Sequence, residues 1–338
     1  MAGGLHVKAH GSWAGARLSE PIPSSSRAED LALAVTVARR YFVDDRTKVE
    51  IAGELKLSRF KVARLLDLAR DSGLVRISIG TPGGVDVELS DQLRRRLGLT
   101  RAIVVNAVDG GDAEIREHLA GLTAELLEEI LTPDDVLGLG WSRSALATAA
   151  RLRRLPPCPV VQLTGALTSP DVSVNLIESV QAVARSGGGR GYTFYSPLFV
   201  ADPASVDVIT RQAEVADAFA RFGQVTTAVV GIGSWQPVRS DLHDALTAEE
   251  RAALQRRDVL ADVCGTFLDA AGTTLSMPLT RQIIAIDAER LHAVRDVICV
   301  AYGRNTAAAV RTAVRAGYVT TLVTTAAFAQ ELLRPTEG

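Results

Sequence analysis

Two short segments between residues 47 and 73 carry apolar residues at the spacing of an amphipathic helix. In the first, the hydroxyl of Thr47 can cap the helix, and the predicted buried face consists of Val49, Ile51, Ala52 and Leu55. In the second, Ser58 is the predicted cap, and the buried face contains either Phe60 or Val62, with Leu65, Leu66 and Leu68. Residues 31–41 predict a leading helix that packs behind these two.

The turn between the two predicted helices is only a few residues long and contains Lys56 and Leu57. Helices that cross steeply over such a turn leave room for a small side chain, and Ala52 lies where it is needed. Lys56 departs from the glycine that often supplies a left-handed conformation here. The pattern predicts a helix-turn-helix, and the alternating residues 74–80 (LVRISIG) predict a strand in the position of a β-wing.

A second kind of pattern begins after TPGG at residues 81–84, which marks the predicted domain boundary. Helical patterns then alternate with short, continuous apolar runs. The predicted helices are residues 88–97, 112–130, 144–152, 175–186, 205–222, 249–257, 305–316 and 325–333. The predicted strands are residues 102–105, 136–140, 160–163, 227–233, 283–286, 297–301 and 319–324. Such runs are typical of strands buried on both faces, so we expect a doubly wound α/β domain with a parallel or mostly parallel sheet.

Length and composition fit this division. The chain has 338 residues, of which 47% are hydrophobic and 22% charged, as in globular proteins. We expect a tail without fixed structure at residues 1–28, a helix-turn-helix domain at 29–80, a linker at 81–87 and the larger domain at 88–335. No apolar run reaches the ~18 residues that cross a bilayer, and the start lacks the apolar core of a secretory signal. These features predict a cytoplasmic protein that does not contact a membrane.

Cysteine and histidine give no sign of a metal site. Cys158, Cys264 and Cys299 are scattered and show no metal-ligand spacing, and they are typical of small core residues in a reducing compartment. The five histidines form no pair at i and i+4 beside a carboxylate. We therefore expect neither a metal ion nor a cofactor.

Charge is distributed unevenly between the two predicted domains. Residues 31–80 contain ten Lys or Arg and six Asp or Glu, so this segment carries +4, whereas the whole chain carries −2 and the remainder about −6. Four basic residues and no acidic one lie between Lys56 and Arg64, which suits a helix in the major groove. The predicted DNA-binding residues are Thr47, Lys48, Ser58, Arg59, Phe60, Lys61 and Arg64. The alternative is an ordinary helical hairpin with a solvated basic face.

Glycine and small polar residues follow several predicted strands, where α/β proteins bind ligands. In residues 138–146 (GLGWSRSAL), Gly138 and Gly140 let the backbone approach a ligand, while Ser142, Arg143 and Ser144 open a helix whose amides can hold an anion or a hydroxyl. The other clusters are Gln162-Leu163-Thr164-Gly165, Gly231-Ile232-Gly233 and Tyr302-Gly303-Arg304-Asn305. Glycines also close many such strands for structural reasons, but four clusters together predict one shared pocket.

The order of these motifs resembles the SorC family of bacterial sugar-responsive transcription regulators. After the reader helices come GLGWSRSALATAARL, VVQLTGAL, YSPLFV, AVVGIG, ADVCGTFLDAAG and VICVAYGRNTAAAVRTAVRAGYVTTLVT, and the resemblance runs from about Leu31 to Leu333. It implies a C-terminal effector domain that is related in fold to sugar-phosphate isomerases and deaminases but lacks catalysis. It also implies assembly into dimers and tetramers, and an operator affinity that changes with a bound sugar, polyol or sugar phosphate.

The resemblance also assigns individual residues. GWSRS stands where the family more often has GWGRT, which implies that Trp141, Arg143 and Ser144 lie on the loop lining the effector pocket. Asp262 falls where the family has an acidic residue facing the effector, although a capping or solvated Asp is the alternative. Thr306 stands where phosphate-binding members carry Lys, which argues against a bisphosphate, and Arg304 could partly replace that cation.

Two other interpretations explain the sequence less well than a regulator. An isomerase or deaminase acting on a sugar phosphate needs a positioned base, typically a carboxylate supported by histidine, and His118, His243 and His292 lie away from the glycine clusters. We therefore expect no catalytic residues. A DNA-architectural protein would leave the large α/β domain unexplained. The sequence predicts a transcriptional regulator that binds double-stranded operator DNA as a homodimer or homotetramer and responds to a sugar, polyol or sugar phosphate.

Overall fold

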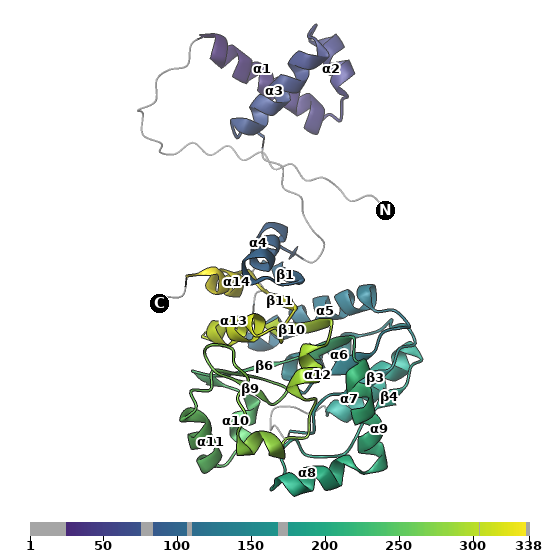
Figure 1. Cartoon of the computed structure of the whole chain (residues 1–338). Helices are drawn as coiled ribbons and strands as arrows, with labels where there is room; N and C mark the ends of the chain where they lie inside the picture. Colours follow the sequence, from purple (N-terminus) through teal and green to yellow (C-terminus); the bar gives the residue numbers. More distant parts are fainter. Residues whose placement is uncertain (1–24, 76–83, 107–109, 168–174, 304, 336–338) are drawn as a thin grey trace. The chain divides into compact units, whose positions relative to one another are not determined.

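The computed structural model describes residues 25–75, 84–106, 110–167, 175–303 and 305–335 (Figure 1). The chain divides into two compact units, residues 1–80 and 81–338. Most of the predicted tail, most of the predicted wing strand and the first half of the predicted linker lie outside the described residues.

The first unit contains α1 (Ser25–Phe42), α2 (Lys48–Glu54) and α3 (Arg59–Asp71). The predicted caps are confirmed, because the Thr47 side chain accepts a hydrogen bond from the backbone of Glu50 and the Ser58 side chain accepts one from the backbone of Lys61. Lys56 adopts a left-handed conformation with φ of 53°, so a lysine does occupy the turn position that favours glycine. The two helices thus form a helix-turn-helix behind which α1 packs.

The buried face of this unit departs from the prediction at Val49 and settles the choice between Phe60 and Val62. Ile51, Ala52 and Val62 are buried, but Val49 is 56% exposed and Phe60 is 85% exposed. Val62, not Phe60, fills the core position because it lies on the same helix face as Leu65, Leu66 and Ala69. α1 begins at Ser25, within the predicted tail, and Pro23 is the last helix-breaking residue before it.

The second unit is built on a parallel sheet of seven strands in the order β1-β11-β10-β5-β2-β3-β4. Its strands are β1 (Arg101–Val105), β2 (Leu137–Leu139), β3 (Val160–Gln162), β4 (Gly191–Tyr192), β5 (Thr227–Val230), β10 (Asp296–Ala301) and β11 (Thr321–Thr325). Every neighbouring pair is parallel, which confirms the predicted sheet. Consecutive residues of β5 supply the cores on opposite faces: Val229 packs with one cluster and Val230 with the other.

Helices lie on both faces of this sheet. The helices of this unit are α4 (Val87–Leu97), α5 (Asp112–Ile130), α6 (Arg143–Arg151), α7 (Leu176–Gly187), α8 (Pro203–Thr210), α9 (Ala213–Arg221), α10 (Asp241–Ala245), α11 (Ala248–Gln255), α12 (Ala288–His292), α13 (Ala307–Arg315) and α14 (Ala326–Leu333). Of these, α10 and α11 pack instead with an antiparallel sheet. Residues 85–87, which were predicted as linker, belong to this unit, because the amide of Asp86 donates to Val104 O and its side chain caps α4. None of the helices in the described part is long and apolar enough to cross a membrane.

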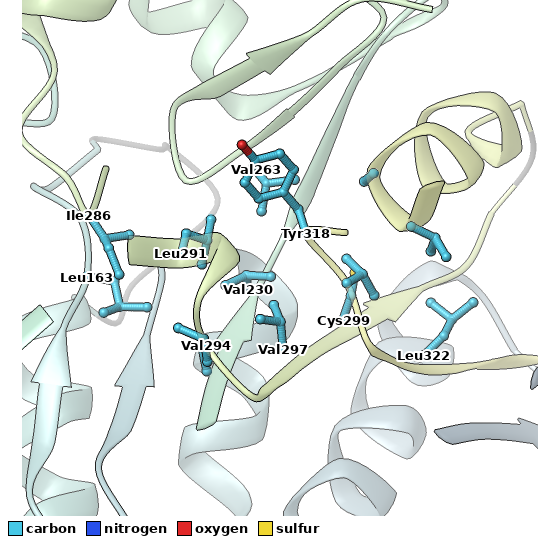
Figure 2. Packing of buried hydrophobic residues seen from close by; sticks show 14 of the residues in the cluster. Leu163, Val230, Val263, Ile286, Leu291, Val294, Val297, Cys299, Tyr318 and Leu322 are labelled. Carbon is cyan, nitrogen blue, oxygen red and sulfur yellow. The ribbon is translucent and has the colours of Figure 1, made fainter. Parts of the chain in front are cut away.

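A second, antiparallel sheet has the order β7-β6-β8-β9 and was not predicted. It consists of β6 (Ile232–Trp235), β7 (Val238–Arg239), β8 (Ala261–Val263) and β9 (Thr266–Leu268). Figure 2 shows Val263 from β8 packed near Val230 of β5 and Cys299 of β10, so this sheet contributes to the same core as the parallel sheet.

Three predicted elements of the second unit are wrong. The run 227–233 is two strands, because the chain leaves the parallel sheet at Gly231 and enters the antiparallel one. Residues 283–286 form only isolated bridges with the loops after β3 and β4. The predicted helix 205–222 is divided into α8 and α9, because Gln212 is extended (ψ 140°) and starts the second helix.

Candidate functional site

The exposed face of α3 is the candidate DNA interface. Arg59, Phe60 and Arg64 are exposed on it, and within the described part of the first unit neither arginine forms an ion pair. Lys61 is less available, because its Nζ lies 3.5 Å from Oδ1 of Asp30 on α1. Two basic side chains and one aromatic ring therefore face outward from the first turns of the helix.

The other predicted DNA-binding residues have structural contacts. Thr47 is occupied in a capping box with Glu50, and the ammonium of Lys48 lies 5.8 Å from the centre of the Tyr41 ring. The Ser58 hydroxyl accepts a hydrogen bond from the backbone amide of Lys61. These side chains lie at or near the ends of α2 and α3, where they support the position of α3.

The candidate ligand pocket lies at the carboxyl ends of β2, β3 and β5, beside the antiparallel sheet. Its cavity volume is about 50 Å³, room for a few water molecules or the polar groups of a small ligand. Six of the predicted residues line it: Trp141, Ser142, Thr164, Gly231, Gly233 and Asp262. Nine further residues complete the lining: Leu167, Leu198, Ile232, Arg239, Ser240, Asp241, Leu242, Cys264 and Gly265.

Asp262 forms the most constrained polar part of the pocket. The residue is only 3% exposed on β8, and its Oδ1 accepts hydrogen bonds from Trp235 Nε1 at 2.8 Å and from Ser240 Oγ at 2.6 Å. Burial raises the pKa of Asp262 to about 6, although these two hydrogen bonds act in the opposite direction. Both hydrogen bonds that the described residues provide end on Oδ1, so the expected pair of ligand hydroxyls would have Oδ2 as its acceptor.

Two loops of the parallel sheet form another wall. The amide of Trp141, after β2, donates to Thr164 Oγ1, after β3, at 3.0 Å. Ser142 caps α6 by accepting from the amide of Ala145 at 3.0 Å. The predicted motif GWSRS is therefore held next to the VVQLTG motif, with the start of α6 at the pocket.

Charged side chains near the pocket partly compensate one another. Arg143, at the first position of α6, forms an ion pair with Asp241 (Nη2–Oδ1 3.5 Å). Arg239, an exposed residue of β7, also lines the pocket, although the sequence did not predict it there. The thiol of Cys264 stays protonated, because burial, with smaller effects from Asp262 and Cys299, raises its pKa to about 12.

Several predicted ligand residues do not line the pocket. Gly138 and Gly140 are needed for packing, because an added Cβ would lie 2.8 Å from Leu163 Cδ1 and from Cys264 Sγ, respectively. The same holds for Gly165, which lies directly against the backbone of Pro197. Ser144 lies on the first turn of α6 outside the lining. These three glycines have the close packing contacts that the structural alternative predicts.

The side chain of Gln162 contacts the protein backbone. Its side chain is completely buried, and it donates to Thr164 O at 2.9 Å and to Phe194 O at 3.2 Å. Its Oε1 accepts from the amide of Phe194 at 3.1 Å. Both amide protons are thus used by the backbone, which leaves no donor for a ligand.

The fourth predicted cluster lies beyond the lining residues. Gly303 and Asn305 both have left-handed conformations, with φ of 93° and 69°. Arg304 lies outside the described residues. Thr306 begins α13 without a side-chain cap. Of the described residues of this cluster, none lines the pocket, and Asn305 is the non-glycine residue with a left-handed backbone.

The segment from Arg239 to Leu242, which connects β7 to α10, lines the pocket and was not predicted. The sequence pattern here is weak, because β7 has two residues and α10 has five. Ser240 caps α10 by accepting a hydrogen bond from the amide of Leu242. Cys264 and Gly265, with φ of 50° and 82°, form the tight turn between β8 and β9 that the ADVCG motif contains.

A helix-turn-helix unit joined to an α/β unit with a small polar pocket defines a ligand-controlled transcription regulator. Comparison with known proteins supports this class. Residues 84–334 match the sugar-binding family described as "Putative sugar-binding domain", and the chain belongs to this family. It is a transcription regulator of the SorC type, as the sequence motifs indicated.

Named relatives match both units. The sorbitol operon regulator of Klebsiella pneumoniae is 24% identical over 313 residues, covering 91% of this chain and 99% of that protein. The deoxyribonucleoside regulator of Bacillus subtilis (strain 168) is 26% identical over 295 residues, covering 86% and 94%. The transcriptional regulator LsrR of Escherichia coli (strain K12) is 26% identical over 305 residues, covering 88% and 93%.

Solved structures show the same fold. The crystal structure of the full-length sorbitol operon regulator SorC from Klebsiella pneumoniae matches with a TM-score of 0.68 at 24% identity, covering 90% of this chain and 99% of that chain. A DeoR family transcriptional regulator from Listeria monocytogenes matches with a TM-score of 0.66 at 21% identity, covering 73% and 99%.

Proposed function

We propose that this protein binds operator DNA through α3 and that a sugar, polyol or sugar monophosphate in the pocket changes its operator affinity. The observation that carries the proposal for the ligand is Asp262, a buried carboxylate in the pocket wall whose Oδ1 is fixed by Trp235 and Ser240. A fixed carboxylate oxygen is a strong acceptor for ligand hydroxyl groups. A ligand hydroxyl that donates a hydrogen bond to the Asp262 carboxylate offsets the desolvation cost of burying that group.

The charges around the pocket favour a ligand with few phosphates. Asp241 and Asp262 line the pocket together with the cation of Arg239. Arg143 is already in an ion pair with Asp241. One phosphate can be held at Arg239 and the start of α6, where backbone amides carry partial positive charge. A second phosphate would meet two carboxylates. We therefore favour a neutral sugar, a polyol or a monophosphate over a bisphosphate.

For DNA binding, we propose that Arg59 contacts a base edge and that Arg64, one turn later on α3, contacts a phosphate. A single unit of this size covers one half-site, so the active form is a homodimer or homotetramer. The relatives are transcriptional regulators, and we assign no catalytic role to the pocket. Sedimentation that shows only monomer at micromolar protein, with and without operator, would refute the assembly.

Thermal unfolding of the full chain tests the ligand class. Sorbitol, ribose, their monophosphates and fructose 1,6-bisphosphate are each titrated, because a ligand that binds the native state alone raises the unfolding temperature with concentration. We expect a rise with at least one polyol, sugar or monophosphate. The Asp262→Asn variant should lose this rise, while Asp207→Asn, an exposed carboxylate on α8, serves as the matched control. A rise with the bisphosphate alone would contradict the charge argument.

A further inference from the structure

Phe60 is the most exposed large hydrophobic residue among those that the structure describes. Its exposed fraction is 85%, whereas Val62, two residues later on α3, is completely buried. Phe60 lies on the helix face opposite to Val62, Leu65 and Leu66, so the ring takes no part in the core of the first unit. Folding therefore gives no reason for an aromatic residue at this position.

The neighbours of Phe60 place it on the proposed DNA-reading surface. It is the second residue of α3, between Arg59 and Lys61, and Arg64 follows one helical turn later on the same exposed face. Lys61 is drawn toward α1 by its ion pair with Asp30. The ring therefore stands beside two arginines that form no ion pair within the described first unit.

We infer that Phe60 reads thymine by packing its ring against the C5-methyl group in the major groove. This inference rests on the proposed binding of DNA through α3. The first residues of a recognition helix contact base edges, so a base contact by Arg59 and a phosphate contact by Arg64 would place the Phe60 ring in the major groove. An apolar ring gains nothing from a phosphate or from the polar edges of guanine, cytosine and adenine, whereas the thymine methyl is an apolar group in that groove.

The contact has a measurable size. Removing one buried methyl group lowers affinity by about three- to fivefold, from the free energy of burying a single carbon group. Replacing thymine with uracil removes that methyl and leaves every hydrogen-bonding group of the base unchanged. The comparison therefore isolates the apolar contact from the contacts of Arg59 and Arg64.

The experiment uses the full chain and a duplex enriched from a random DNA pool by the wild-type protein. Affinity is measured by fluorescence anisotropy for this duplex and for versions with one thymine at a time replaced by uracil. The proteins compared are wild type, Phe60→Ala and Phe60→Leu. Val49→Ala, which truncates a 56% exposed residue on α2, is the matched control.

We expect one or two thymine positions at which uracil lowers the affinity of the wild type about three- to fivefold and that of Phe60→Ala not at all. Phe60→Leu should keep part of the effect, and Val49→Ala should keep all of it. Equal uracil effects in the wild type and Phe60→Ala would overturn the inference and leave the proposed function intact. Unchanged DNA affinity combined with altered sedimentation of Phe60→Ala would make the residue a protein contact instead, and this too would overturn it. Failure to enrich any duplex would contradict the proposed function itself.

Discussion

Replacement of Asp262 by Asn should make the stability of the second unit less dependent on pH. Asn has nearly the same shape as Asp, and its oxygen can still accept the hydrogen bonds from Trp235 Nε1 and Ser240 Oγ. The substitution therefore removes the buried negative charge and little else. In the wild type that charge must form inside the protein as the pH rises.

The size of the effect follows from the pKa. Burial raises the pKa of Asp262 from 3.8 to about 6, against the hydrogen bonds from Ser240 and Trp235. Because the folded pKa is the higher one, the folded protein holds the proton more tightly than the unfolded chain. Stability is therefore fully present below the unfolded pKa and is lost as the pH rises through the folded pKa. The total loss is about 3 kcal/mol, and about 2 kcal/mol of it falls between roughly pH 4.5 and 7.5.

Urea unfolding followed by tryptophan fluorescence measures this effect, because Trp141 and Trp235 both lie in the second unit. The free energy of unfolding of Asp262→Asn minus that of the wild type should increase by about 2 kcal/mol from about pH 4.5 to 7.5. Asp207→Asn controls for loss of a surface charge on the same unit. A difference that stays constant, or that decreases as the pH rises, would refute the reasoning.

Three further predictions concern the two units. Arg59→Ala should weaken operator binding by about 1–3 kcal/mol. Arg64→Ala should weaken binding to all DNA sequences similarly and reduce the slope of log affinity against log salt by about one. Unchanged affinity of both variants in anisotropy titrations would show that α3 is not the DNA interface. Hydrogen bonds from Thr226, Thr132 and Arg295 outweigh burial and lower the pKa of Asp135 to about 2, so Asp135→Asn should cost on the order of 2 kcal/mol in urea unfolding at neutral pH. That cost should decrease as the pH falls through about 2, and a cost independent of pH would contradict it. Phe267 is completely buried against Trp235, so Phe267→Ala should lower the free energy of unfolding by about 3–5 kcal/mol. A decrease under about 1 kcal/mol would be incompatible with this packing.

The parallel sheet and most of its helices were predictable because each element carries its own signal. The helix predicted at residues 112–130 agrees with α5, since a capping glutamate begins it and its apolar face is continuous. Residues 227–233 misled the prediction, because the run stays apolar through Gly231 while the chain passes between two sheets. β8 and β9 have three residues each, which is too short for a strand period to be visible.

The pocket was predictable only in part for a related reason. Trp141, Ser142 and Thr164 lie at the ends of strands, where the topology of a parallel sheet collects polar residues. Gln162 has the same position in the sequence pattern, but its partner is the backbone of Phe194, 32 residues away, and no local pattern contains that contact. No local pattern showed whether Phe60 or Val62 enters the core, so the exposure of Phe60 could not be predicted either.

Operator affinity measured with and without ligand tests the central claim most directly. The full chain is titrated against its enriched duplex in the absence and presence of the sugar, polyol or monophosphate that raises its unfolding temperature, with wild type and Asp262→Asn side by side. The account predicts that the ligand changes the operator affinity of the wild type at least fivefold, the lower end of typical coupling between two sites. It also predicts that Asp262→Asn binds the operator as the wild type does without ligand and no longer responds to it. An equal response in both proteins, or none in the wild type at saturating ligand, would contradict it.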